Sequence, residues 1–208
     1  MITERLANPD LAEFEVSGVT RGSFLLRGAL AAGAVYGTAA VAPFVSNALG
    51  ATTDLDILNF ALTLEYLETD FYQRVAPTVG LSAAAAHDAS NFGKEEAAHV
   101  AALTAAIKSS GGTPVAKPTF VFPVKNAAEF LGLAYTVENL GVSAYNGAGP
   151  LLQSKTLLAA AGSIVQIEAR HAAAIALMIG KSPTPSGGFD APKNMSQVLS
   201  VAGQLIKK

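Results

Sequence analysis

EARHAAAI, at residues 168–175, is the stretch that decides the fold of this chain. It places Glu168, Arg170 and His171 inside a run that is otherwise apolar and close to the C-terminus. Residues 96–103, EAAHVAAL, show the same Glu-x-x-His spacing 72 positions earlier. Two copies of one pattern of ionisable residues, each set in an apolar run, indicate an internal repeat.

The repeat extends to the segments that precede these two stretches. TLEYLETDFYQ at residues 63–73 aligns with TVENLGVSAYN at residues 136–146, here with an offset of 73. The chain therefore looks like a duplicated helical hairpin, in which ionisable residues repeat together with the apolar pattern. The repeated polar pairs are Glu96 and Glu168, His99 and His171, Glu65 and Glu138, and Tyr72 and Tyr145.

Apolar residues recur at intervals of three and four from Asp54 onward, which predicts an all-α fold. Two connections, 77–81 and 148–153, are short, so the helices that they join should be antiparallel neighbours. The connection at 111–125 contains three prolines and, fully extended, can span about 50 Å. These features predict a four-helix bundle with a long crossover between its second and third helices. The expected helices are 54–76, 82–110, 126–147, 154–179 and a short 195–206.

The composition of the chain excludes several classes of function. The 208 residues are 50% hydrophobic and only 14% charged, against about 25% charged in ordinary soluble domains. The net charge of −2 and the lack of a long basic run give nucleic-acid binding no electrostatic support, so we expect no nucleic-acid partner. The absence of cysteine excludes disulfides, thiolate metal sites and cysteine nucleophiles.

The first 50 residues differ in composition from the rest of the chain. Residues 1–20 are polar and acidic, and an apolar segment without charged residues follows between Arg27 and Asp54. We therefore divide the chain into an N-terminal segment, residues 1–50, and a bundle domain with a C-terminal tail, residues 51–208.

The apolar segment is typical of an export signal. In TRGSFLLR, Arg21 is followed by Gly22, where a twin-arginine signal would have its second arginine. Small residues at 46–50 offer cleavage sites. We expect export to the periplasm or cell envelope. The alternatives are a membrane anchor, if the segment is not cleaved, and a cytoplasmic protein with a docked N-terminal helix, if the segment is not a signal.

The repeated pairs have the chemistry of a metal site. Residues three apart on a helix share one face, so each Glu-x-x-His can present a carboxylate and an imidazole to one ion. With one further glutamate from each partner helix, four carboxylates and two imidazoles would point into the bundle. Two divalent cations would balance four carboxylates that are otherwise costly to bury. Oxygen and imidazole ligands without thiolate suit Fe or Mn, with Zn possible.

Residues 54–180 resemble the ferritin-like superfamily, and most closely the bacterial ferritin-like domain proteins related to plant desiccation-related proteins. The stretches that carry the resemblance are LDILNFALTLEYLETDFY, KEEAAHVAAL and the trailing FDAPKNMSQVL. The resemblance implies a ferritin-like four-helix bundle with a dinuclear metal centre. Carried onto this sequence, the implied ligands are Glu65, Glu96, His99, Glu138, Glu168 and His171.

Two other glutamates compete as ligands. Glu68 lies one turn from Glu65, but its counterpart in the repeat is Gly141, so we favour Glu65. Glu95 precedes a predicted ligand, and we expect it to face solvent and to pair with Lys94 or other nearby charges.

Other polar residues near the pattern have two interpretations each. Tyr72 and Tyr145 are candidate catalytic residues, as radical or hydrogen-bonding groups near the metals, although a purely packing role is at least as consistent with the sequence. Arg170 either orients a carboxylate or faces outward. His87 is expected at the surface. The two repeated histidines could also be core imidazoles in a site that has lost its metal.

These observations support three hypotheses for function. The first is a di-iron or di-manganese oxidoreductase that reacts with O₂ or peroxide in a ferroxidase-like or catalase-like manner. The others are a non-catalytic metal-binding or stress-protective bundle of the envelope, and a metal-free scaffold. Which glutamate pair bridges the metals stays open. The apolar surface of the fourth predicted helix indicates a homo-oligomer interface or a cover by the C-terminal segment, rather than a membrane span.

Overall fold

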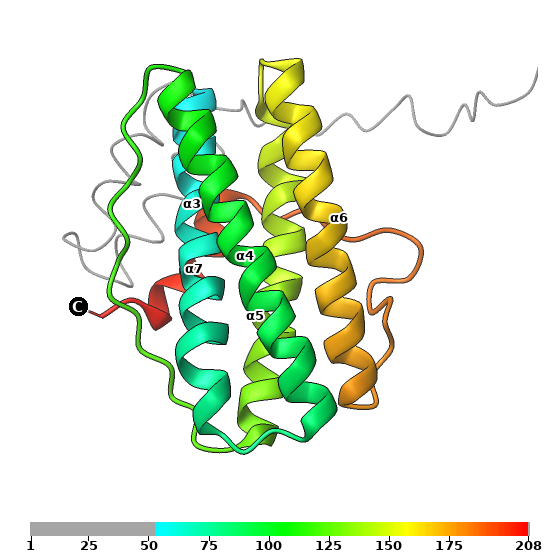
Figure 1. The fold of residues 1–208 in the computed structure, drawn as a ribbon. Helices are drawn as coiled ribbons and strands as arrows, with labels where there is room; N and C mark the ends of the chain where they lie inside the picture. The colour runs from blue at the N-terminus through cyan, green and yellow to red at the C-terminus, as the bar shows by residue number, and fades with distance from the viewer. Residues whose placement is uncertain (1–52, 208) are drawn as a thin grey trace, which may run out of the picture.

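The computed structural model describes residues 53–207, and the predictions for residues 1–50 lie outside this range. The described part is helical, as predicted, and forms the expected bundle with a short C-terminal helix (Figure 1). Its main helices are α3 (Asp54–Asp70), α4 (Ala83–Ser109), α5 (Ala127–Ala148), α6 (Lys155–Met178) and α7 (Met195–Ala202).

The four long helices form two hairpins. Helix α3 packs mainly on α4, and α5 packs mainly on α6. The connection from α4 to α5 runs along the full length of the bundle, as Figure 1 shows, so the predicted crossover is confirmed. It is held to α3 by the backbone N–H of Val115, which donates to Asn59 Oδ1 at 2.7 Å, and by the Lys117–Asp70 ion pair, also at 2.7 Å.

Side-chain caps fix where the helices begin. Thr53 forms a capping box with Asp56 at the start of α3. Ser82 and Asn126 accept backbone N–H groups at the starts of α4 and α5. The carboxylate of Asp54 also accepts the backbone N–H of Ser154 at 2.9 Å, which ties the first turn of α3 to the start of α6. Local capping chemistry thus fixes where these helices begin.

One part of the first helix differs from the prediction. Instead of continuing as α-helix to residue 76, the chain widens into a π-helical turn at Phe71–Val75, which is followed by a 3₁₀ turn. Within this wider turn the adjacent Phe71 and Tyr72 are both buried in the core, at 0% and 2% exposure.

The C-terminal segment packs on one helix of each hairpin rather than over α6. Helix α7 contacts α5 and α3, and the last residues pair with the crossover through an antiparallel bridge between Phe120 and Ile206. The chain reaches α7 by crossing α5 closely at Gly147, where an added Cβ would lie 1.9 Å from the carbonyl oxygen of Lys193.

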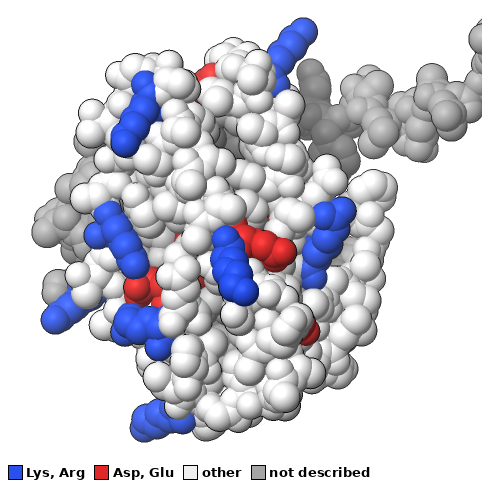
Figure 2. Space-filling view, in the orientation of Figure 1, with Lys and Arg blue, Asp and Glu red and all other residues white. Residues whose placement is uncertain are grey.

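The exposed face of α6 carries apolar residues, with Leu158 and Leu177 exposed at 41% and 65%, together with polar ones, Ser163, Gln166 and Arg170. On the face shown in Figure 2, charged side chains are scattered and most of the surface is uncharged. Among the helices of residues 53–207, none is long and apolar enough to cross a membrane. A homo-oligomer interface on α6 stays a prediction.

Candidate metal centre

The predicted ligands come together in the middle of the bundle. Each of the four long helices contributes at least one of them, and α4 and α6 contribute the two Glu-x-x-His pairs. All are buried, and the four carboxylate side chains are 0% exposed. The residues that meet there are Glu65, Glu96, His99, Glu138, Glu168 and His171.

The first half of the cluster surrounds His99. Its Nδ1 lies 3.1 Å from Glu65 Oε2, 3.1 Å from Glu96 Oε2 and 3.0 Å from Glu168 Oε1. These four residues each offer a ligand atom within 4.8 Å of the others. Four donors from three helices at that separation can hold one metal ion.

The second half surrounds His171. Its Nδ1 lies 2.8 Å from Glu96 Oε1 and 3.5 Å from Glu138 Oε2. Glu168 completes this group, whose ligand atoms again lie within 4.8 Å of one another. Glu96 and Glu168 thus belong to both halves, whereas the other carboxylates and the two imidazoles belong to one half each.

Several oxygen and nitrogen atoms of the cluster that could bind a metal have no hydrogen-bond partner although they are completely buried. They include Nδ1 of His171, which lies near Glu96 but without the alignment of a hydrogen bond. Buried polar atoms are normally satisfied, and leaving one without a partner costs about 1–3 kcal/mol. Such atoms facing one another at the buried centre of the bundle fit a bound cation, so this set of oxygen and nitrogen atoms suits the metals that the resemblance implies. The other orphaned atoms of the cluster are Glu96 Oε1, Glu138 Oε2 and both carboxylate oxygens of Glu168.

The protonation equilibria of the cluster reflect this crowding. Burial raises the pKa of Glu65 to about 8. Burial, together with repulsion from Glu65 and Glu96, raises the pKa of Glu168 well above its ordinary value. Burial alone would lower the pKa of His99, but the carboxylates around its ring, Glu168 first, raise it to about 12. Without metal, protons therefore supply the positive charge that the carboxylates require.

Two tyrosines reach the cluster across the bundle in a reciprocal manner. The hydroxyl of Tyr145 on α5 donates to Glu65 Oε1 on α3 at 2.5 Å. The hydroxyl of Tyr72, in the π-helical turn, donates to Glu138 on α5. Burial raises the pKa of both phenols well above the ordinary value, which keeps them as neutral donors. Both rings are also buried in the core, so packing and hydrogen bonding coexist, and a catalytic role for either residue stays a prediction.

Glu95 differs from its expected role. Its side chain is 51% exposed, but its Oε2 accepts a hydrogen bond from Nε2 of His171 at 2.7 Å, so its partner is not Lys94. A carboxylate on the second ring nitrogen fixes the tautomer and orientation of a ligand imidazole. The repeat gives no signal for this contact, because the residue that corresponds to Glu95 in the second hairpin is Ile167.

The remaining polar residues named from the sequence fall outside the cluster or beside it. Arg170 is exposed on α6, so it faces outward. His87 is a surface residue, as predicted, with its side chain 74% exposed next to Asp88. Glu68 is only 3% exposed and lies beside the cluster rather than in either four-residue group.

An antiparallel bundle whose helices present buried carboxylates and histidines at its centre defines a class of carboxylate-bridged helical proteins. A family model for the ferritin-like domain matches residues 53–181, which include α3 to α6. The chain therefore belongs to the ferritin-like domain family, and the resemblance drawn from the sequence is confirmed at that level. A comparison with curated proteins finds no match.

Proposed function

We propose that this chain is a dinuclear Fe or Mn protein that acts as an oxidoreductase on O₂ or peroxide, in a ferroxidase-like or catalase-like manner. The observation that carries the proposal is the pair Glu96 and Glu168, which two overlapping groups of buried donors share. A single metal ion would need only one such group, and a structural core would not leave these carboxylate oxygens without hydrogen bonds.

We infer a role for each proposed ligand from the two overlapping groups. Glu96 and Glu168 would bridge the two ions. Glu65 and His99 would complete one position, and Glu138 and His171, through Nδ1, would complete the other. The four carboxylates of this ligand set balance the charge of two divalent ions.

Fe or Mn would supply the change of oxidation state that a reaction with O₂ or peroxide needs. The protein holds the surrounding groups in place for that chemistry. The hydroxyl of Tyr145 holds Glu65, and that of Tyr72 holds Glu138. Glu95 orients the ring of His171 from outside. A stress-protective role related to desiccation, and export through the N-terminal segment, are part of the same proposal and rest on the sequence.

Metal analysis followed by a reaction assay tests the proposal. Protein purified without chelator, or loaded anaerobically with Fe(II) or Mn(II), is expected to hold two ions per chain. The loaded protein is then expected to consume peroxide or to oxidise Fe(II) with O₂ faster than the free metal does. Fewer than one ion per chain after loading would refute the metal centre. Full loading without either reaction would leave a non-catalytic metal-binding protein in place of the oxidoreductase.

A further inference from the structure

A fifth buried carboxylate lies against the cluster. Glu68 follows Glu65 by one turn on α3, and its side chain is 3% exposed. Among residues 53–207, its carboxylate has no hydrogen-bond or ion-pair partner, but its oxygens, unlike the orphaned oxygens of the cluster, are not completely buried. Its nearest charged neighbours are other carboxylates, which together with burial raise its pKa well above the ordinary value.

The position of Glu68 depends on Gly141 of α5. A Cβ added at residue 141 would lie 3.2 Å from Glu68 Oε1 and 3.4 Å from Glu168 Oε2. The oxygens of Glu68 and Glu168 therefore border the same small space at the centre of the bundle. Gly141 is also the residue that corresponds to Glu68 in the repeat. The second hairpin thus lacks a side chain at the place where the first hairpin inserts a carboxylate.

We propose that Glu68 is a seventh protein ligand of the dinuclear centre, next to Glu168 and opposite Gly141. This inference rests on the proposed metal centre. An unpaired carboxylate is costly to bury, and a cation beside it removes that cost. Glu68 also raises the number of carboxylates to five, one more negative charge than two divalent ions balance. The filled centre would therefore favour a trivalent ion in at least one position.

Metal-loaded protein with Glu68→Gln or Gly141→Ala tests this role. Glu68→Gln keeps the shape and removes the charge. Gly141→Ala keeps the charge and places a methyl group 3.2 Å from the Glu68 carboxylate, which must shift by a few tenths of an ångström, and 3.4 Å from the Glu168 carboxylate. Gly132→Ala is the matched control, because a Cβ at Gly132 on the same helix meets no atom within 4 Å. Thermal melts of the metal-free variants establish that each one is folded.

Both test variants are expected to bind Mn(II) at least tenfold more weakly than the wild-type protein, the lower end of the loss seen when partners of a metal site are removed. Glu68→Gln should also shift the reduction potential of the iron-loaded centre to a more positive value. A crystal structure of the Mn-loaded protein should place a Glu68 oxygen about 2.0–2.6 Å from an ion. Wild-type affinity and potential in both variants, or a Glu68 oxygen outside that range, would overturn the proposal. Loaded protein that shows these effects but is inert toward O₂ and peroxide would refute the proposed oxidoreductase and support the role of Glu68.

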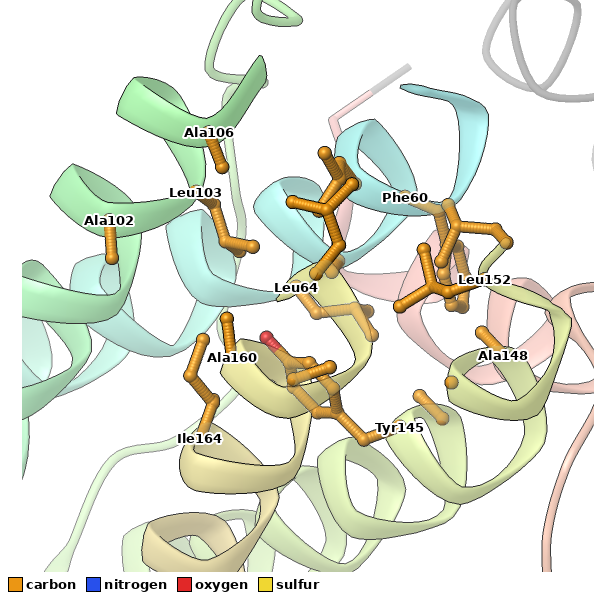
Figure 3. A pocket seen from close by; sticks show the side chains of 17 residues that line it. Phe60, Leu64, Ala102, Leu103, Ala106, Tyr145, Ala148, Leu152, Ala160 and Ile164 are labelled. Atoms are coloured by element: carbon orange, nitrogen blue, oxygen red, sulfur yellow. The ribbon is translucent and has the colours of Figure 1, made fainter. Parts of the chain in front are cut away.

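A different observation concerns the substrate. An apolar cavity of about 50 Å³ lies between the helices on the Glu65 side of the cluster. Figure 3 shows side chains such as Leu64, Leu103 and Ile164 around it, together with the ring of Tyr145. The hydroxyl of that tyrosine is already donated to Glu65. A water molecule needs two to four polar partners, which this lining does not supply.

We infer that this cavity holds a small apolar molecule, and that dioxygen, rather than the polar peroxide, occupies it. The inference rests on the proposed function and selects between its two substrates. The ring of Tyr145 is a wall of the cavity, and its hydroxyl contacts a predicted ligand of the His99 position. Dioxygen in the cavity would thus lie one side chain away from that half of the centre.

Xenon, which enters dry apolar cavities, probes the cavity independently of any reaction. Crystals under xenon pressure should show a xenon atom beside Tyr145, and Ala144→Val should abolish it. Ala134→Val, which changes another buried alanine of α5 away from the cavity, is the matched control. In metal-loaded protein, Ala144→Val should slow the reaction with O₂ at least fivefold and leave the reaction with peroxide unchanged. No bound xenon, or equal effects of the two variants on O₂, would overturn the inference. A xenon site in protein that reacts with neither oxidant would refute the proposed function and retain the apolar cavity.

Discussion

Replacement of Glu168 by glutamine is expected to remove both metal ions at once, whereas the same change at Glu65 removes one. Glu168 supplies a donor to both four-residue groups, and Glu65 supplies one only to the group around His99. Glutamine has nearly the same shape as glutamate and is neutral, so neither change should open a cavity. The difference between the two variants therefore reports which carboxylates are shared.

The magnitude follows from the number of ions lost. An ion present at 100 times its Kd stabilises the folded protein by about 2.7 kcal/mol, so two ions contribute about 5.4 kcal/mol. For a chain of this size, 1 kcal/mol corresponds to about 2–4 °C in Tm. Metal should thus raise the Tm of the wild-type protein by about 10–20 °C, that of Glu65→Gln by about half as much, and that of Glu168→Gln by almost nothing.

Differential scanning calorimetry with and without Mn(II), together with metal analysis of the same samples, measures these values. Two ions per chain are expected for the wild-type protein, one for Glu65→Gln and none for Glu168→Gln. If Glu168→Gln keeps one ion and half of the thermal stabilisation, Glu168 is a terminal ligand and the shared-carboxylate interpretation is wrong. If Glu65→Gln loses both ions, the two positions do not fill independently, and the calculation fails at that step.

Three further predictions concern other parts of the molecule. The metal-free protein should lose stability as the pH rises from about 4.5 to 8. The pKa of Glu65 is raised to about 8 in the folded state, so the folded protein binds more protons than the unfolded chain across that range. Chemical denaturation at several pH values measures this slope, and a rise in stability would contradict the prediction. Glu95→Gln should weaken Mn(II) binding about 10–100-fold without loss of folding, because it weakens the hydrogen bond that orients the imidazole of His171. Isothermal titration calorimetry gives the affinity, and an unchanged Kd would show that this contact does not contribute to metal binding. Gly147→Ala should destabilise the protein by about 1–3 kcal/mol or more, since its Cβ would overlap the carbonyl of Lys193. Gly162→Ala, with open space around the added Cβ, should be neutral or stabilising. Urea denaturation compares the two variants, and equal stabilities would contradict the close crossing of α5 and the C-terminal segment.

Much of the fold could be predicted from the sequence, because its determinants are local. The three-and-four spacing of apolar residues, the capping residues Ser82 and Asn126, and the short turns fix two helical hairpins without knowledge of distant contacts. The long, proline-containing connection is long enough to run along the bundle, which favours a crossover. The π-helical turn at Phe71–Val75 was not predictable in this way. The turn depends on how Phe71 and Tyr72 pack against side chains from other helices, and the local sequence pattern does not specify that packing.

The gathering of six polar residues at one point was likewise predictable, because the internal repeat duplicates their positions. Two departures from the repeat were not. Whether Glu95, at the edge of the inward face of α4, turns to His171 depends on how closely α4 and α6 approach each other. The burial of Glu68 depends on the missing side chain at Gly141 across the bundle. In the sequence, the glycine at position 141 was instead the reason to favour Glu65 over Glu68 as a ligand.

The two halves of the repeat therefore specify different properties of the centre. The symmetric positions supply the proposed ligands and the reciprocal tyrosine contacts, in which a tyrosine of each hairpin donates to a buried carboxylate of the other. The asymmetric positions would make the two proposed metal positions unequal. Among residues 53–207, a carboxylate contacts the second ring nitrogen of His171 but not that of His99, and the additional carboxylate beside Glu168 comes from α3 alone. A centre built only from the duplicated pattern would bind two equivalent ions. Since an added carboxylate stabilises the higher oxidation state of the ion nearest to it, the departures from symmetry, rather than the repeat itself, should determine which ion is oxidised first.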